Sequence, residues 1–458
     1  MNTDPVPSLL AEAAELLGRQ FDHLPASDSP PISADAMAEV LNRTAQRLGD
    51  NYPYFHPLYA GQMLKPPHPV ARAAYALAMA INPNNHARDG GRASSAMEIE
   101  AVAAIAAMFG WSDSPFLGHL TSSGTMANLE ALWVAGQLAP GKRIVGSEQA
   151  HYTHERISAV LKLPYASVAS DQRGRMNLEA LEAELRRSDV GTVVVTMGTT
   201  AIGAVDPLDQ VVALRAKYGF RIHVDAAYGG YFRLIADRLD EPARRAYQAI
   251  VQADSIVVDP HKHGLQPYGC GCVLFRDPAV GRFYKHDSPY TYFTSHELHL
   301  GEISLECSRA GASAVALWAT QQLLPLTPGG DFARGLAGGR AAALDLDRRL
   351  RSDEDRRFEG LEHGSPELDI VVWKLAAENP HRASERAQQI FDACARRNLH
   401  LALVQLPQRW FRSGSGMNQS AENDMVTCLR SVLMKPEHEQ WMGRIWGAFT
   451  AAVADTRG

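Results

Sequence analysis

Cysteine is scarce in this sequence, and long apolar runs are missing. The five cysteines among 458 residues make no even set of pairs and no Cys-x-x-Cys motif, so we expect reduced thiols and no bound metal. No apolar run approaches the roughly 20 residues of a membrane-spanning helix, and residues 1–5 lack the basic and apolar regions of a secretory leader. We therefore expect a soluble, cytoplasmic protein with no membrane partner.

An excess of positive charge is missing as well. The formal net charge is −6, which argues against a nucleic-acid partner. Hydrophobic residues make up 46% and charged residues 21%, a composition that excludes a disordered or fibrous chain. Because 458 residues are too many for one ordinary core, we expect an N-terminal segment at 1–69, a large domain at 70–330 and a small domain at 331–458.

Strand and helix patterns alternate along the large domain, which is typical of an α/β fold with a largely parallel sheet. Apolar runs predict strands at 143–147, 192–197, 221–225, 255–258 and 272–275. Helical spacing predicts helices at 9–21, 36–48, 70–81, 95–110, 153–163, 178–187, 208–218 and 313–324. The helix at 95–110 would carry Glu98 and Glu100 in its first turn, where acidic residues favour the helix dipole. The small domain is expected to hold strands at 368–373, 399–406 and 427–434 and helices at 332–351, 384–396 and 437–453.

A lysine stands at the end of one of these predicted strands. The apolar run 255–258 breaks at Pro260, and Lys262 follows, flanked by His261 and His263. A lone lysine in such a place is most often a solvated loop residue. Beside a cavity at the edge of an α/β sheet, it is a candidate nucleophile that forms an imine.

A carboxylate stands at the end of another predicted strand. Asp225 ends the run 221–225 and is followed by the small residues Ala226 and Ala227. An aspartate there can keep a pyridine nitrogen protonated, and small residues leave room for a flat ring. Together with Lys262, it meets what pyridoxal phosphate (PLP) requires, one group for the ring nitrogen and one for the aldehyde.

A turn of small residues leads into the helix that follows residue 125. Ser123, Gly124 and Thr125 would present backbone amides and hydroxyls at a helix N-terminus, where the dipole favours an anion. Plain capping of the helix by Ser123 is the simpler alternative. With Lys262 and Asp225 in the same chain, we assign the phosphate of PLP to this turn.

Four motifs in register resemble the group II PLP-dependent amino-acid decarboxylases, which include the glutamate, tyrosine and aromatic-L-amino-acid enzymes. They are Thr-Ser-Ser-Gly-Thr at 121–125, Ala-His-Tyr-Thr-His-Glu at 150–155, His-Val-Asp-Ala-Ala-Tyr-Gly-Gly at 223–230 and Asp-Pro-His-Lys at 259–262. The resemblance extends from about residue 50 to about residue 320. It implies a fold type I PLP enzyme, with an aspartate aminotransferase-like large domain, a mostly parallel seven-stranded sheet and a small C-terminal α/β domain. It also implies a homodimer with shared active sites and N-terminal helices that pack across it.

The resemblance assigns roles to further residues. His151 is expected to stack on the pyridine ring and to help orient the substrate carboxylate, Ala227 to lie against the other face, and His261 to contact the cofactor. Thr200, with Thr199 as the alternative, is expected to reach the ring oxygen or the substrate carboxylate. Ser308 is expected near the phosphate of the neighbouring subunit. The residues alone leave a surface position as the alternative for His151, at a helix N-terminus, and they place His154 at the surface.

The segment 282–295 resembles the catalytic loop of the family, in which a tyrosine protonates Cα after CO₂ leaves. We assign this role to Tyr292 and keep Tyr290 as the alternative. An aldehyde-forming variant would lack such an acid. A related carbon–carbon lyase of phosphorylated amino alcohols would need basic residues for a second phosphate, and we identify none.

Two sets of residues favour different substrates. An apolar wall for tyrosine, dopa or tryptophan is available from Tyr52, Tyr54 and Phe55. Asn84, His86 and Arg88 are instead candidates to bind an acidic side chain, as in glutamate or aspartate. We favour decarboxylation of an aromatic amino acid, with the acidic substrate as the alternative.

Overall fold

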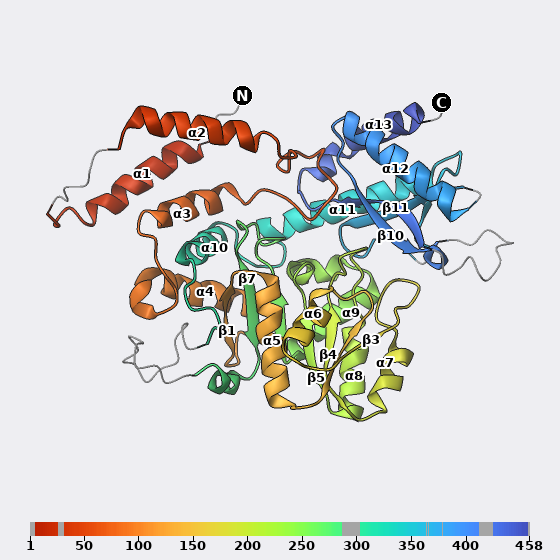
Figure 1. The fold of residues 1–458 in the computed structure, drawn as a ribbon, viewed down its shortest axis with the longest axis horizontal. Helices are drawn as coiled ribbons and strands as arrows, with labels where there is room; N and C mark the ends of the chain where they lie inside the picture. Colours follow the sequence, from red (N-terminus) through yellow and green to blue (C-terminus); the bar gives the residue numbers. More distant parts are fainter. Residues whose placement is uncertain are drawn as a thin grey trace.

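The computed structural model describes residues 5–25, 32–285, 303–362, 364, 366–377, 379–411 and 425–456. Figure 1 shows a large domain, a smaller C-terminal domain beside it and two N-terminal helices that extend over the large domain. Within the described ranges, no helix has both the length and the apolar character needed to cross a membrane.

The large domain is built on a seven-stranded sheet, as the sequence predicted. Its strands run in the order β1-β7-β6-β5-β4-β2-β3. Every described strand of this sheet except β7 points the same way, because β7 pairs antiparallel with both β1 and β6. The strands are β1 (Leu117–Thr121), β2 (Arg143–Ser147), β3 (Tyr165–Val168), β4 (Val190–Thr196), β5 (Arg221–Asp225), β6 (Ser255–Val258) and β7 (Gly271–Phe275).

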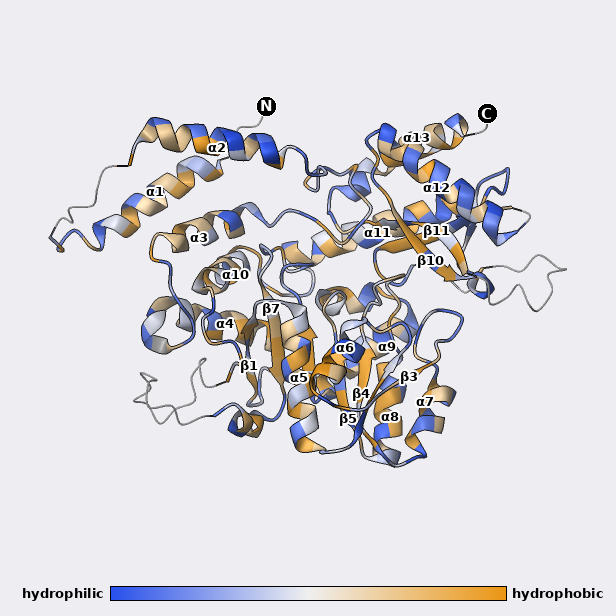
Figure 2. Cartoon of the chain, in the orientation of Figure 1, coloured by the Kyte–Doolittle hydropathy of each residue, from blue (hydrophilic) through white to orange (hydrophobic). Residues whose placement is uncertain are grey.

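Both faces of this sheet are covered, which explains why its central strands are continuous apolar runs. In β6 every residue is buried, and neighbouring side chains point to opposite faces. Val257 packs with Ala127 and Ala131 of helix α5 (Gly124–Leu138), whereas Ile256 belongs to the core on the other face. Figure 2 shows these inner strands as the orange centre of the domain.

Other helices surround the sheet close to where the sequence predicted them. The matching helices are α3 (Pro69–Met79), α4 (Arg92–Met108), α6 (Thr153–Val160), α7 (Leu178–Leu185), α8 (Leu208–Tyr218) and α10 (Gly311–Leu323). Helix α9 (Glu241–Ala249) and the strands β1 and β3 were not predicted. β1 contains Gly118 and His119, and β3 is an edge strand of mixed polarity, so neither shows the apolar run of a central strand.

The small domain contains a four-stranded antiparallel sheet in the order β10-β11-β9-β8. Its strands are β8 (Phe358–Gly360), β9 (Ile370–Leu375), β10 (Ala402–Pro407) and β11 (Met425–Val432). Its helices are α11 (Asp331–Arg351), α12 (Pro380–Arg396) and α13 (His438–Asp455). This confirms the predicted small α/β domain and adds β8, which is too short to show a pattern.

The N-terminal helices are α1 (Val6–Arg19) and α2 (Ala34–Leu48), and neither buries a residue in the single chain. The segment that follows them is attached to the small domain rather than to the helices. The amide of Ala60 donates to the carbonyl of His400, and the amide of Val432 donates to the carbonyl of Ala60. The division of the chain at residues 69 and 330 remains our proposal.

Candidate active site

A cavity of about 190 Å³ lies where the parallel strands end. In open α/β sheets, ligands bind at the carboxyl ends of the strands. Nine predicted site residues line this cavity, namely Ser123, Gly124, Thr125, His151, Thr200, Asp225, Ala227, His261 and Lys262. The sequence analysis missed other lining residues, namely Asn128, Thr153, Thr196, Gly198, Tyr228 and Asp259.

Lys262 enters the cavity from the turn that follows β6. Its backbone amide donates to the carbonyl of Asp259, which closes the turn. Its Nζ lies 3.1 Å from Oδ2 of the same Asp259, and about a quarter of its side chain is exposed. The amine is therefore held at the cavity by an ion pair three residues away in sequence.

Asp225 is the buried carboxylate of the site, with 4% of its surface exposed. Oδ2 lies 2.8 Å from Nε2 of His154, and Oδ1 accepts from the amide of Ala227 at 3.0 Å. Burial alone raises the pKa of Asp225, but the hydrogen bond from His154, followed by the charge of Lys262, lowers it below its ordinary value. The carboxylate is therefore ionised at neutral pH.

The expectation that His154 lies at the surface is wrong. The residue is completely buried in α6 and faces β5, where it pairs with Asp225. The helix repeat carried the signal, because His154 lies three residues before Ile157 and four before Ser158, which are also buried. These positions share one face of the helix, and that face points to the sheet.

His151 lies just before α6 and lines the cavity from the other side. Its Nδ1 lies 2.8 Å from Oγ1 of Thr153 and accepts from the amide of Thr153 at 3.3 Å. Burial lowers the pKa of His151, and the nearby charge of Lys262 also lowers it. A neutral ring that accepts at Nδ1 carries its proton on Nε2, so His151 is a hydrogen-bond donor through Nε2.

The first turn of α5 forms another wall of the cavity. Ser123 is the N-cap, and its Oγ accepts from the amide of Met126 at 3.2 Å. The amides of Gly124 and Thr125 open the helix, where no preceding helical carbonyl can accept from them. A Cβ atom at Gly124 would overlap the carboxylate of Asp259. Capping and anion binding are therefore compatible here, because they use different groups.

Two threonines near the end of β4 have different surroundings. Thr199 is buried, and its Oγ1 accepts from the amide of Ala204, so it stabilises its own loop. Thr200 lines the cavity, and its carbonyl accepts from Arg430 of β11 at 2.8 Å. Thr196 also lines the cavity, and its buried Oγ1 has no hydrogen-bond partner among the described residues.

Several predicted residues lie outside the cavity. Ser308 is exposed, and its Oγ accepts from Nδ2 of Asn84 at 3.1 Å. His86 and the aromatic set Tyr52, Tyr54 and Phe55 do not line it either. Tyr290 and Tyr292 fall outside the described residues. The walls that would contact a substrate side chain are therefore incomplete in the described part of one chain.

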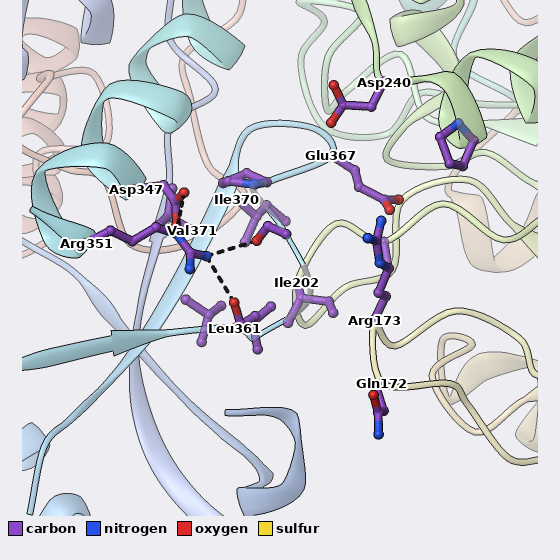
Figure 3. Close-up of a pocket in the computed structure, with 15 residues that line it drawn as sticks. Gln172, Arg173, Ile202, Asp240, Asp347, Arg351, Leu361, Glu367, Ile370 and Val371 are labelled. Carbon is purple, nitrogen blue, oxygen red and sulfur yellow. Dashed lines mark hydrogen bonds and ion pairs between the residues drawn. The ribbon is translucent and has the colours of Figure 1, made fainter. Parts of the chain in front are cut away.

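A second cavity of about 360 Å³ lies between the two domains (Figure 3). Most of its charged groups have partners. Arg351 pairs with Asp347 and donates to the carbonyls of Leu361 and Gly364. Glu367 pairs with Arg175 in the same way. The N-terminus of α9 reaches this cavity through Asp240 and Pro242, but no lysine is among its lining residues, so it lacks the amine that imine chemistry requires.

Comparison with known proteins identifies the class to which this site belongs. The family described as "Pyridoxal-dependent decarboxylase conserved domain" matches residues 29–324, which is more than half of the chain. The chain belongs to this family. It is a PLP-dependent carboxy-lyase that decarboxylates an amino acid, and the predicted fold, cofactor and enzyme class are confirmed.

Individual relatives differ in the substrate that their names give. The "L-tyrosine decarboxylase" of Enterococcus faecium is 29% identical, and the match covers 96% of this chain and 93% of that protein. A "Probable L-tyrosine/L-aspartate decarboxylase" of Methanothermobacter thermautotrophicus is 28% identical over 72% of this chain and 86% of its own. The "L-2,4-diaminobutyrate decarboxylase" of Rhizobium meliloti is 34% identical over 46% of this chain and 44% of its own.

Solved structures share the fold. The structure of "mouse CSAD" has a TM-score of 0.76 at 21% identity, covering 96% of this chain and 91% of its own. The structure of "Oryza sativa TDC with PLP and tryptamine" has a TM-score of 0.77 at 18% identity, covering 100% of this chain and 99% of its own. At these identities the likeness concerns the fold alone.

Proposed function

We propose that this decarboxylase uses the cavity at the ends of β4, β5 and β6 and acts on an aromatic L-amino acid. One observation carries the proposal: Lys262 and the buried carboxylate of Asp225 line the same cavity, although 37 residues separate them. An amine and a carboxylate so placed meet the two ends of a pyridoxal ring. Oγ1 of Thr196 and Oδ1 of Asp259 have no hydrogen-bond partner within the described part of the chain, so they are available to a polar ligand.

In this proposal the first turn of α5 holds the cofactor phosphate through Ser123, Gly124 and Thr125. Asp225 would accept a hydrogen bond from the protonated ring nitrogen, and Lys262 would supply the amine for the aldehyde. When bound, PLP supplies an electron sink for the bond that breaks at Cα. Ala227 and His151 would flank the two faces of the ring, and His261 would contact it from the strand end.

His151 is also the residue that we assign to the substrate carboxylate. Its Nε2 proton is available to orient that group, because Nδ1 already accepts from Thr153. Thr200 is assigned to the ring oxygen or the substrate carboxylate. We assign the return of a proton to Cα to Tyr292, with Tyr290 as the alternative, and the contact to the neighbouring subunit's phosphate to Ser308.

An aromatic substrate is supported by the Enterococcus faecium relative, whose name gives tyrosine and whose match covers nearly the whole of both chains. It is also supported by Tyr268, whose ring lies 5.0 Å from the ring of His261 beside the cavity. An acidic amino acid is the alternative, because the name of the Methanothermobacter relative includes aspartate.

Two measurements test this proposal. Borohydride reduction followed by peptide mapping is expected to find the reduced cofactor on Lys262, and Lys262→Ala is expected to lose the absorbance of the bound cofactor. Cofactor attached elsewhere would contradict the site. Incubation with each of the twenty amino acids, tyrosine and aspartate among them, and with 2,4-diaminobutyrate is expected to release the amine of an aromatic one. Release from aspartate or diaminobutyrate alone would overturn the substrate assignment.

We also propose a homodimer in which α1 and α2 cover the partner subunit. Leu9 and Leu16 of α1 are each more than half exposed, as are Val40 and Leu41 of α2, although both helices are amphipathic. Sedimentation of the double variant Leu16→Glu/Leu41→Glu is expected to show monomers where the unchanged protein shows dimers. Dimers in both would contradict this role of the helices.

A further inference from the structure

His154 contacts Asp225, the carboxylate assigned to the ring nitrogen of the cofactor. Its Nε2 lies 2.8 Å from Oδ2 of Asp225, and its ring is completely buried. The other oxygen of Asp225 accepts from the amide of Ala227. Each carboxylate oxygen of Asp225 therefore accepts one hydrogen bond from the protein. Its remaining lone pairs are available to a ligand in the cavity.

The proton between Nε2 of His154 and Oδ2 of Asp225 resides on His154. Asp225 is ionised and accepts only, so Nε2 must donate. The opposite nitrogen, Nδ1, is buried and has no hydrogen-bond partner among the described residues. A doubly protonated ring would leave a charged N–H buried without an acceptor, whereas a neutral ring leaves only an unused lone pair.

Other ionisable groups surround the pair. His223 of β5 lies with its ring 6.1 Å from that of His154, and burial lowers its pKa to about 3, so it is neutral. Lys262 and His151 act on Asp225 and His154 from the cavity side, and Asp259 faces His151. A protonated cofactor ring would add a cation on the same carboxylate, which disfavours a second cation at His154.

We infer that His154 is a positioning residue, which as a neutral donor through Nε2 keeps the Asp225 carboxylate ionised and oriented toward the ring nitrogen of the cofactor. This inference rests on the proposed cofactor site. His154 does not touch the cofactor, so its effect is exerted through Asp225. Without this donor the carboxylate is no longer held facing the ring nitrogen, so its contact with the ring proton weakens and the ring nitrogen loses part of its preference for a proton.

The test compares two variants at this position. His154→Gln keeps a neutral N–H at nearly the place of Nε2, whereas His154→Leu removes it. PLP labelled with nitrogen-15 in its ring reports the protonation of that ring by NMR. We expect the unchanged protein and His154→Gln to keep the ring protonated over the same pH range. In His154→Leu the midpoint of ring deprotonation is expected to fall by about one to two pH units, with PLP bound roughly ten- to a hundred-fold more weakly.

A spectrum and an affinity for His154→Leu equal to those of the unchanged protein would overturn the inference. So would His154→Gln behaving like His154→Leu. If His154→Leu does not fold, the protonation of the His154 ring is measured instead, by NMR of the unchanged protein labelled with nitrogen-15 histidine. The His154 signals are assigned by comparison with His154→Gln. One protonated and one bare ring nitrogen support a neutral donor, and two protonated nitrogens overturn it. Absence of labelled PLP on Lys262 in the unchanged protein would instead refute the cofactor site.

Discussion

At the residue scale, the chemistry of Asp225 depends on its charge more than on its shape. Asp225→Asn keeps the size of the side chain but removes the charge that His154 and Lys262 stabilise. We expect PLP affinity and decarboxylation to fall by about a hundred-fold or more, since breaking one side of a buried charged pair costs about 3 kcal/mol. PLP titration by fluorescence, with amine release measured at saturating PLP, checks this. Affinity within two-fold of the unchanged protein would contradict it.

Asp206 is a second buried carboxylate, outside the cavity. Its oxygens accept from the amides of Met176 and Thr196, at 2.7 and 2.8 Å. Burial raises the pKa of Asp206 from 3.8 to about 7, although both amides favour the ionised form. Between these pH values the folded chain holds a proton that the unfolded chain has lost. The contribution of Asp206 to stability is therefore present below pH ~4 and is lost as pH rises toward 7.

This titration predicts a pH-dependent difference between Asp206→Asn and the unchanged protein. From pH ~4 to ~7, the stability of the unchanged protein is expected to fall by up to about 4 kcal/mol more than that of the variant. Urea unfolding of both proteins at several pH values measures the difference. Other groups that titrate in this range, such as Asp369, whose pKa burial raises to about 6, contribute equally to both proteins. Parallel pH profiles would contradict the prediction.

Site residues that lie at the end of a strand could be predicted from the sequence. Residues whose role comes from a contact with a distant segment could not. Lys262 and Asp225 could be predicted because an apolar run followed by a polar residue places that residue at the edge of a parallel sheet. His154 could not be placed by the same argument. Its role comes from a contact with Asp225, 71 residues away, that forms only when α6 packs on β5.

At the element scale, the first turn of α5 depends on the lack of a side chain at Gly124. Gly124→Ala would push its new methyl group into the carboxylate of Asp259, which pairs with Lys262. We expect PLP affinity to fall at least about ten-fold, since one lost charge-assisted contact is worth about 1.5 kcal/mol or more. Fluorescence titration with PLP measures this effect.

Gly443→Ala is the matched control, because this glycine lies in α13 with no atom within 4 Å of the added Cβ. Its PLP affinity is expected to stay unchanged, and its stability to rise by up to about 1 kcal/mol because alanine is the better helix former. Equal PLP affinity for the two variants would show that the turn tolerates a side chain.

Helix boundaries show what sequence patterns omit at this scale. The helix predicted at 95–110 begins at Arg92, so its first turn contains no acidic residue. Glu98 lies further into the helix and is buried, where it accepts from the amide of Leu120 and pairs with Arg309. An acidic residue near a predicted helix start was interpreted as a dipole effect, but its actual partners lie outside the helix, Asn85 among them.

At the scale of the whole molecule, contacts between distant segments determine where the site loops lie. Arg430 of β11 is buried and donates to the carbonyls of Thr200 and Ala201 in the large domain. It also donates to Oε1 of Gln62 in the N-terminal segment. The sequence predicted both domains from their local patterns. It gave no sign that one arginine joins three parts of the chain, because such a contact has no periodicity.

Arg430→Met therefore tests whether the small domain supports the cavity. Methionine fills much of the same volume but leaves the carbonyls of Thr200 and Ala201 without their donor. We expect a loss of about 3 kcal/mol in stability to urea, and weaker PLP binding because the Thr200 loop is no longer held. Arg397→Met is the control, since Arg397 forms an exposed pair with Asp455, and exposed pairs contribute little to stability. Equal losses of stability and equal PLP affinity in the two variants would contradict this prediction. Arg430 would then contribute no more than an exposed ion pair, and the small domain would not support the cavity through it.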